Sequence, residues 1–206
     1  MITPVSFGLG IVILLVSAIT GGTLLLAPGS IRLQRPQCGW AGWAFNIINL
    51  SFFFILIPFC GLMMISNTQP PFFICIDITS TPLLIVLEVM GVFTFLVGSL
   101  LLLWSRLSLR RSFRLPGVMP DQSDYLTLHG PYKQIRHPMY LAALLVLVGI
   151  TLILASLLML LMCITMFLLL QKLIPKEEEQ LERAYPIAYA EYCRRVPGAL
   201  FPNKQA

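Results

Sequence analysis

The chain has 206 residues, of which 57% are hydrophobic and 11% are charged, with a formal net charge of +5 and a mean hydropathy of +0.85. These values exclude an ordinary soluble globular domain and indicate a polytopic membrane protein. The Lys and Arg residues lie in short segments beside apolar runs, which is typical of membrane topology signals and argues against a nucleic-acid partner.

The five cysteines show no metal or disulfide pattern. They form no CxxC pair and are scattered over apolar runs and loops, at Cys38, Cys60, Cys75, Cys163 and Cys193. Zinc sites and disulfide frameworks are recognised by paired or regularly spaced cysteines, so we interpret these residues as small hydrophobic side chains. No bound metal is expected.

Three apolar runs in the first half of the chain are long enough to cross a bilayer as helices. Residues 5–27 form the first, which we interpret as a retained span, because no basic residue precedes it and no cleavage site leads into a soluble domain. Residues 40–66 form the second, with Trp40 and Trp43 as interfacial aromatics. Residues 82–104 form the third.

Polar residues inside these runs have two interpretations. Asn46, Asn49 and Pro58 in the second run are typical of helix–helix hydrogen bonds and a kink, and a substrate contact is the alternative. Glu88 in the third run is either a functional residue within the membrane or a side chain that reaches the interface.

The longest apolar run, residues 139–174, must fold back on itself. As one helix it would reach about 54 Å, well beyond a hydrocarbon core of about 30 Å. We expect a tight turn near Ala155 and Ser156. The predicted fold is therefore all-α and polytopic, with five transmembrane helices, the last two a helical hairpin, and a C-terminal cytosolic helical tail.

Basic residues alternate between the predicted loops. The loops after the first and third spans and the C-terminal tail are basic, whereas the N-terminus, the second loop and the hairpin tip contain neither Lys nor Arg. The positive-inside rule therefore predicts an outside N-terminus and a cytosolic C-terminus. We expect three transmembrane helices over residues 1–104, and a catalytic module over residues 105–206 that contains the basic loop.

The motif GPYKQIRHPMY, residues 130–140, borders the hairpin on its cytosolic side. It places Arg136 and His137 at the membrane border. Pro138 disfavours helical geometry at the residue before it, so the polar groups of His137 are free to face a ligand. A structural hydrogen bond for His137 and a plain interfacial position for Tyr140 are the alternatives.

The tail, residues 175–202, is the other sizeable polar segment. Pro175 suits the first turn of a helix, where the helix dipole would favour the acidic residues 177–179. Apolar and aromatic residues then recur every three or four positions, and Pro186 either starts a second short helix or kinks the first.

Two arguments favour a site in this tail over a solvated interfacial helix. An acidic cluster beside the negatively charged cytosolic leaflet is unfavourable unless it meets a cation. The two hairpin helices are antiparallel, so their outer ends return to one side and bring the Arg-His-Pro segment next to the glutamates. We therefore expect a composite pocket formed by the motif and the tail.

Together these segments resemble a known superfamily. GPYKQIRHPMY, an apolar hairpin, PKEEEQL and AYAEYCRRVPGALFP are similar to the integral-membrane methyltransferases of the isoprenylcysteine carboxyl methyltransferase and phospholipid methyltransferase superfamily. The resemblance extends over residues 120–202, and the first three spans agree only in kind. It implies a pocket for S-adenosylmethionine that the tail closes and that opens to the bilayer lipids for a lipophilic acceptor.

The resemblance also implies site residues. Arg136 and Lys172 are the candidates to meet or polarise the acceptor. A carboxylate can hold the ammonium or ribose hydroxyls of the cofactor, and tyrosine faces favour a sulfonium cation. The implied cofactor contacts are Asp124, Tyr125, Leu126, Thr127, Tyr132, His137, Pro138, Met139, Tyr140 and Glu177.

Two positions depart from the family pattern. In the carboxyl methyltransferases an Arg stands four residues before the cofactor-binding Glu, and the equivalent position here is Leu173, with Lys172 beside it. Residues 124–127 also differ from the usual His-x-Leu-Val. The acceptor is therefore open among the carboxylate of a prenylated cysteine, a phospholipid amine, a small thiol and an isoprenoid acid.

Two other functions remain as alternatives. AEYCRRVPGALFP and the His-Pro-x-Tyr motif also resemble membrane sterol reductases, which would use NADPH, but the acidic run at residues 177–179 favours the methyltransferase. A non-catalytic lipid-binding scaffold of the same fold would tolerate Glu177→Asp, whereas a cofactor pocket would be sensitive to this shortening.

Overall fold

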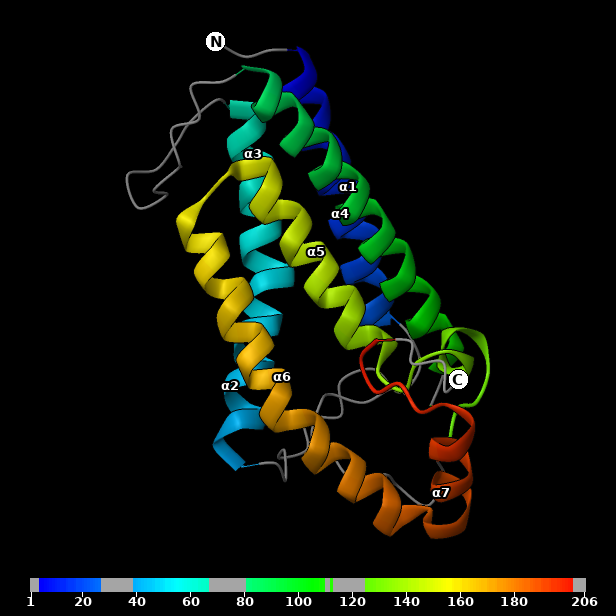
Figure 1. Ribbon diagram of the computed structural model, residues 1–206. Helices are drawn as coiled ribbons and strands as arrows, with labels where there is room; N and C mark the ends of the chain where they lie inside the picture. Colours follow the sequence, from blue (N-terminus) through cyan, green and yellow to red (C-terminus); the bar gives the residue numbers. More distant parts are fainter. Residues whose placement is uncertain (1–3, 27–38, 67–80, 110–111, 113–124, 202–206) are drawn as a thin grey trace.

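The computed structural model describes residues 4–26, 39–66, 81–109, 112 and 125–201, and the regular elements within them are helices, which confirms the all-α class. In chain order they are α1 (Pro4–Leu26), α2 (Gly39–Ser51), the π-helical turn η1 (Phe52–Leu56), α3 (Ile57–Ser66), α4 (Thr81–Leu109), the 3₁₀ turn η3 (Gly130–Lys133), α5 (Pro138–Leu154), α6 (Leu157–Ala184) and α7 (Pro186–Arg195) (Figure 1).

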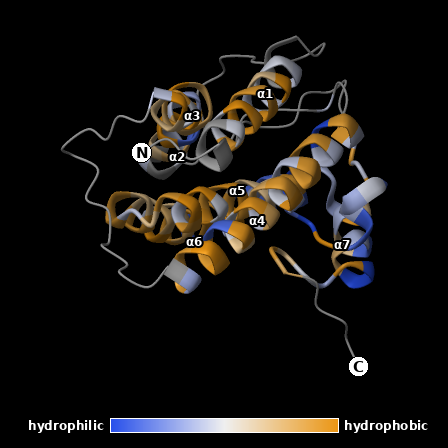
Figure 2. Cartoon of the chain, turned by 90° about the horizontal axis from the view of Figure 1, so that it is seen from above, coloured by the Kyte–Doolittle hydropathy of each residue, from blue (hydrophilic) through white to orange (hydrophobic). Residues whose placement is uncertain are grey.

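The long helices form two layers (Figure 2). One layer contains α1 and the continuous helix made by α2, η1 and α3, and the other contains α4, α5 and α6. Contacts of α1 with α4 and of α2 with α6 join the layers. α7 is hydrophilic and lies at the end of the bundle opposite the start of α1 (Figures 1 and 2).

Three helices in the described part of the chain are long and apolar enough to cross a membrane, namely Gly42–Ser66, Pro82–Leu109 and Leu157–Ala184. The apolar helices Gly8–Thr23 and Pro138–Leu154 are shorter. Large apolar side chains point outward from the bundle, among them Ile55, Phe93, Leu100 and Leu168. So much exposed apolar surface suits contact with lipid, and the protein is a membrane protein.

The hairpin turn lies where the sequence predicts it. α5 ends at Leu154 and α6 begins at Leu157. Between them Ala155 has a left-handed backbone, with φ 44° and ψ 40°, and Ser156 accepts a hydrogen bond from Leu160 N–H at 3.1 Å. The two helices are therefore antiparallel, and the end of α6 returns toward the start of α5.

The predicted helix start at Pro175 is wrong, because α6 continues through this residue to Ala184. Proline removes one backbone donor, but good helix formers flank it, and one missing hydrogen bond bends a helix without ending it. In Figure 1, α6 changes direction and its second half runs toward α7. Glu177 to Glu179 thus lie inside a helix, away from an N-terminal dipole. Pro186 does begin the second helix, α7.

The helix that contains the third predicted span extends beyond it. α4 continues beyond Trp104 to Leu109, because the first helix-breaking proline of the following segment comes only at Pro116. Arg106, expected in the basic loop, therefore lies in the last turns of α4 and is only 2% exposed. The other arginines of that loop lie outside the described residues.

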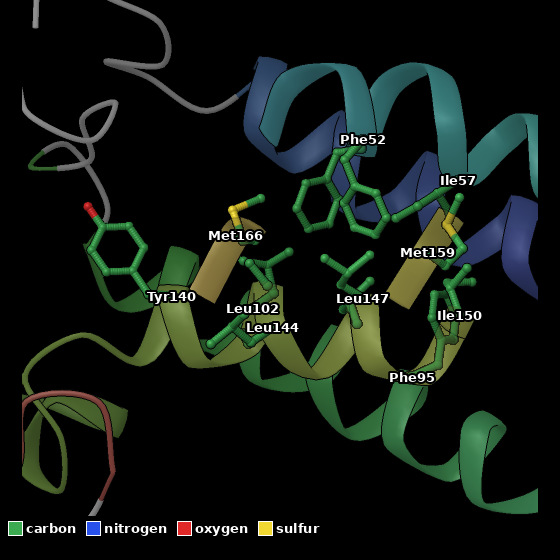
Figure 3. Close-up of a cluster of buried hydrophobic side chains, with 14 of the residues drawn as sticks. Phe52, Ile57, Phe95, Leu102, Tyr140, Leu144, Leu147, Ile150, Met159 and Met166 are labelled. Atoms are coloured by element: carbon green, nitrogen blue, oxygen red, sulfur yellow. The ribbon is translucent and has the colours of Figure 1, made fainter. Parts of the chain in front are cut away.

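A cluster of buried apolar side chains fills the space between the layers (Figure 3). Its labelled members include Phe52, Phe95, Leu147 and Met159. Tyr140 lies at one end of the cluster, and its hydroxyl oxygen is directed away from the apolar side chains. This tyrosine therefore joins the core to the polar groups at the end of the bundle.

Glycines permit close packing between neighbouring helices within each layer. A Cβ at Gly149 of α5 would lie 2.6 Å from the backbone nitrogen of Phe95 on α4. A Cβ at Gly10 of α1 would lie 2.8 Å from the carbonyl oxygen of Gly61 on α3. Small residues allow backbones to approach in membranes, where packing and not hydrophobic exclusion holds helices together.

Candidate active site

Gly130 directs the motif past the end of α4. Its φ is +63°, and a Cβ there would collide with Ser108 Oγ. Glycine adopts this conformation without strain. Pro131 then occupies the first turn of η3, in which Pro131 and Tyr132 are buried. This local geometry leads the chain to Arg136.

His137 caps the start of α5. Its backbone is non-helical, with φ −121° and ψ 60°, and Pro138 follows at the first helical position. This confirms the expectation that the proline excludes His137 from helical geometry. The carbonyl of His137 accepts hydrogen bonds from the N–H groups of Tyr140 (3.2 Å) and Leu141 (3.3 Å), so the backbone at this corner is held by the helix.

The segment after α7, residues 196–200, returns to the motif, and we call it the C-terminal strap. The backbone N–H of Arg136 donates to the carbonyl of Gly198 at 3.0 Å. The N–H of His137 donates to the carbonyl of Ala199 at 2.9 Å. The end of the described chain is therefore fixed against the residues that precede α5.

The guanidinium group of Arg136 links three segments. Its Nη1 donates to the carbonyls of Val196 and Pro197, at 2.8 Å each. Its Nε donates to Glu178 Oε1 at 2.8 Å. One side chain of the motif therefore binds both the C-terminal strap and α6, which confirms that the Arg-His-Pro segment and the glutamates meet.

Glu178 is held in its ionised form. It lies in the polar part of α6, residues 175–184, which carries six charged residues and extends beyond the apolar stretch suited to a hydrocarbon layer. Burial by itself would raise the pKa of Glu178, but hydrogen bonds and charges from His137 and Arg136 lower it to about 2. Burial would likewise lower the pKa of Arg136, and Glu178 raises it above its ordinary value.

Glu177 has a different set of neighbours. The hydroxyl of Tyr140 donates to Glu177 Oε2, and His137 Nδ1 lies 3.9 Å from the same oxygen. The rings of His137 and Tyr140 are stacked, with centroids 5.4 Å apart and an interplanar angle of 11°. Phe45 of α2 meets Tyr140 edge-on at 5.4 Å. The Glu177 side chain keeps 27% of its surface exposed, so its carboxylate remains accessible.

The residues shortly before the motif lie close to α7. Leu126 packs against the buried cluster of Tyr189, Tyr192 and Val196. Thr127 is buried, and its Oγ1 has no hydrogen-bond partner within the described part of the chain. Tyr125 is half exposed. Asp124 lies outside the described residues.

The remaining predicted cofactor contacts lie within or beside the core. The Tyr192 hydroxyl of α7 donates to the carbonyl of Tyr132 at 2.8 Å. Pro138 is buried, and Met139 packs against the main apolar cluster. These residues frame the motif, and their contact with a cofactor stays a prediction.

Lys172 lies apart from this network, on an exposed position of α6. Its Nζ is 5.5 Å from the ring centroid of Trp40, which is itself 67% exposed. Leu173, at the position of the family's Arg, is fully buried in the core. Lys172 therefore lies beside the contact between α2 and α6, five residues before Glu177 in the sequence.

Sequence reasoning missed Glu178 as an individual site residue. On a continuous α6, Glu178 lies on the same face as Ile174, four residues earlier, and Ile174 is buried. Helical periodicity would therefore have identified Glu178 as a residue that faces the inside of the bundle. Placing a helix start at Pro175 broke this register. The carbonyls of residues 196–199 give no sequence signal, since every residue carries one.

Glu88, left open from the sequence, does not belong to this site. It lies near the start of α4, whereas the site contacts the end of that helix at Ser108. The intervening 20 residues of helix correspond to about 30 Å.

A comparison with protein families finds one match over part of the chain. Residues 86–187, about half of the chain, match the family model of phospholipid methyltransferases. No individual curated protein matches the chain. The matched region contains most of α4, the motif, the hairpin and the glutamates of α6. The chain therefore belongs to the superfamily of integral-membrane methyltransferases that includes this family.

Proposed function

We propose that this protein transfers the methyl group of S-adenosylmethionine to a lipophilic acceptor at the cytosolic border of the membrane. One observation carries the proposal. The accessible carboxylate of Glu177 lies beside the hydroxyl of Tyr140 and the imidazole of His137, and all three belong to the region that matches the family. The motif and the acidic segment thus form one group of side chains.

The residues present fit this cofactor. Its ammonium or ribose hydroxyls suit the carboxylate of Glu177, and its cationic sulfonium suits the electron-rich face of Tyr140. The buried Oγ1 of Thr127, which lacks a hydrogen-bond partner among the described residues, is a further polar group suited to a ligand. We retain the other predicted contacts, apart from His137, as part of the same proposed pocket.

When bound, S-adenosylmethionine supplies a methyl group that is already activated on a sulfonium. The protein then has to align the acceptor and exclude water. Arg136 serves this indirectly, because its hydrogen bonds hold the C-terminal strap and Glu178 against the motif. We propose that Lys172, beside the exposed ring of Trp40, meets the polar group of the acceptor on the membrane side.

Five transmembrane helices are proposed for the whole chain. α1 and α5 are apolar, and the described helices run alternately up and down the bundle in Figure 1. The 17 residues of α5 span about 25 Å, which suits a helix whose start lies at the border of the hydrocarbon core. With the basic loops inside, the motif and the glutamates of α6 face the cytosol.

The acceptor class has two leading candidates. The description of the family model names phospholipids, which supports the amine of a phospholipid headgroup. The motifs shared with the isoprenylcysteine carboxyl methyltransferases support the carboxylate of a prenylated cysteine. Both acceptors carry long apolar chains and a polar end, as expected for a site at the membrane border.

Thermal-shift titration of the detergent-purified protein tests the cofactor. We expect S-adenosylhomocysteine at about 100 times its Kd to stabilise the protein by about 2.7 kcal/mol. Glu177→Ala should lose this stabilisation. The matched control is Glu179→Ala, which removes an exposed carboxylate paired with Arg183 on the same helix and should retain it. Stabilisation by NADPH and not by S-adenosylhomocysteine would replace the proposal with the reductase alternative.

A further inference from the structure

The imidazole of His137 lies between two carboxylates. Its Nε2 is 3.2 Å from Glu178 Oε1, within hydrogen-bond distance, and its Nδ1 is 3.9 Å from Glu177 Oε2, which is beyond it. The His137 side chain is only 6% exposed. The two nitrogens therefore have different surroundings, and these surroundings determine which nitrogen carries the hydrogen.

Glu178 determines the tautomer of His137. Its Oε1 already accepts the Nε–H of Arg136 at 2.8 Å, and this charged hydrogen bond keeps the carboxylate ionised at neutral pH. An ionised carboxylate can only accept hydrogen bonds. The hydrogen of the neutral ring therefore belongs on Nε2, where it is donated to Glu178, and the lone pair lies on Nδ1.

The ring is fixed with Nδ1 toward Glu177. Stacking on Tyr140 sets the plane of the ring, and the backbone bond from His137 N–H to Ala199 sets its position. Glu177 Oε2 accepts the Tyr140 hydroxyl, so it is also an acceptor. A single nitrogen can lie about 2.9 Å from each of two acceptors 3.9 Å apart, so an acceptor ammonium group can donate to Nδ1 and to Oε2 together, which leaves Oε1 of Glu177 for the cofactor.

We propose that His137 Nδ1 accepts the proton from the acceptor atom that becomes methylated, and that Glu178 is the positioning residue that fixes His137 for this step. The inference rests on the proposed methyltransferase function. It extends it from cofactor binding to the acceptor chemistry, because an amine that is protonated at neutral pH has no lone pair with which to attack a methyl group.

With an ammonium acceptor, one N–H bond of the acceptor breaks and its proton moves to His137 Nδ1. The freed lone pair of the acceptor nitrogen forms a bond to the methyl carbon. The carbon–sulfur bond breaks and its electron pair stays on sulfur, which leaves a neutral thioether. The imidazolium then lies between the carboxylates of Glu177 and Glu178, and its proton leaves to solvent past the accessible Glu177.

A measurement that does not depend on activity tests the tautomer. The chain has two histidines, so ¹⁵N-histidine labelling of the His129→Gln variant leaves one imidazole to observe. We expect an NMR spectrum at pH 7.5 with a protonated Nε2 and an unprotonated Nδ1. A ring that carries its hydrogen on Nδ1, or on both nitrogens, would overturn the proposal.

His137→Gln tests the chemistry, because the glutamine amide replaces the Nε2–H donor to Glu178 but places no base at Nδ1. We expect normal stabilisation by S-adenosylhomocysteine and a kcat for phosphatidylethanolamine vesicles that falls by about 10²- to 10⁴-fold, with KM within a few-fold. His129→Gln is the control and should match the wild type, since His129 is exposed outside this network.

The outcomes separate this inference from the proposed function. Wild-type kcat in His137→Gln would overturn the role of His137 and leave methyl transfer intact. Loss of S-adenosylhomocysteine binding in the variant would also overturn it, in favour of the cofactor contact. Failure of the wild-type protein to bind S-adenosylhomocysteine would reject the proposed function itself.

Discussion

Three adjacent glutamates on α6 have three different environments. Glu177 accepts a hydrogen bond from Tyr140, Glu178 pairs with Arg136, and Glu179 is exposed. Consecutive residues on a helix point about 100° apart, so a run of like residues cannot share one role. The sequence predicted that the acidic run meets the Arg-His-Pro segment, but the neighbours of each carboxylate depend on the register of the helix.

The pair formed by Glu178 and Arg136 predicts a loss of stability when its charge is removed. Because Arg136 also bonds the C-terminal strap, Glu178→Gln weakens a partly buried, charged hydrogen bond that orders the tail. We expect the apparent unfolding free energy in detergent at pH 7 to fall by about 1–3 kcal/mol. Glu179→Gln removes an exposed pair and should change it by less than about 1 kcal/mol.

The same pair predicts the pH dependence. The pKa of Glu178 is lowered from 4.5 to about 2, so its stabilising effect is complete above pH 4.5 and is lost as the pH falls toward 2. Wild type and Glu178→Gln should therefore differ at pH 7 and converge in thermal stability over that acidic range. A difference that stays constant from pH 7 to pH 2 would contradict the ion pair.

At the scale of elements, apolar run length predicted the hairpin and its turn, because the limit is physical. A helix longer than the bilayer must fold back, and the turn fell at Ala155 and Ser156. The error at Pro175 has an equally physical origin. Proline is compatible both with a helix start and with a bent helix interior, and the tertiary contacts that favour the second are not visible in local sequence.

Helix packing predicts which glycines matter. Gly149→Ala should destabilise the protein by about 1–3 kcal/mol, because the new methyl group would overlap Phe95 of α4. Gly8→Ala is the control, since a Cβ there meets nothing within 4 Å, and it should be neutral or stabilising by up to about 1 kcal/mol. Thermal unfolding in detergent compares the two, and equal effects would argue against the close α4–α5 contact.

At the scale of the whole molecule, topology decides whether the site faces the cytosol. Single cysteines at Lys133 and Ala155, in a variant without native cysteines, report opposite ends of α5. We expect a membrane-impermeant maleimide added to intact cells to label position 155 and to reach position 133 only after permeabilisation. Labelling of position 133 from outside would reverse the proposed orientation.

Charge distribution and span length predict this topology, because both follow from the bilayer, and its orientation stays a prediction. The closure of the site was not predictable from the same signals. It depends on backbone carbonyls of the C-terminal strap that bond Arg136 and His137 from about 60 residues away in the sequence, as the contacts to Val196 and Ala199 illustrate.

The most direct test of the account is methyl transfer itself. The purified protein in lipid nanodiscs would be incubated with S-adenosylmethionine labelled on its methyl group, with phosphatidylethanolamine and a farnesylated cysteine as separate acceptors. We expect label in the extracted lipophilic product of at least one acceptor for the wild type and for Glu179→Ala, and at least a 100-fold lower rate for Glu177→Ala. Equal rates for Glu177→Ala and the wild type would contradict a site at the junction of the motif and α6.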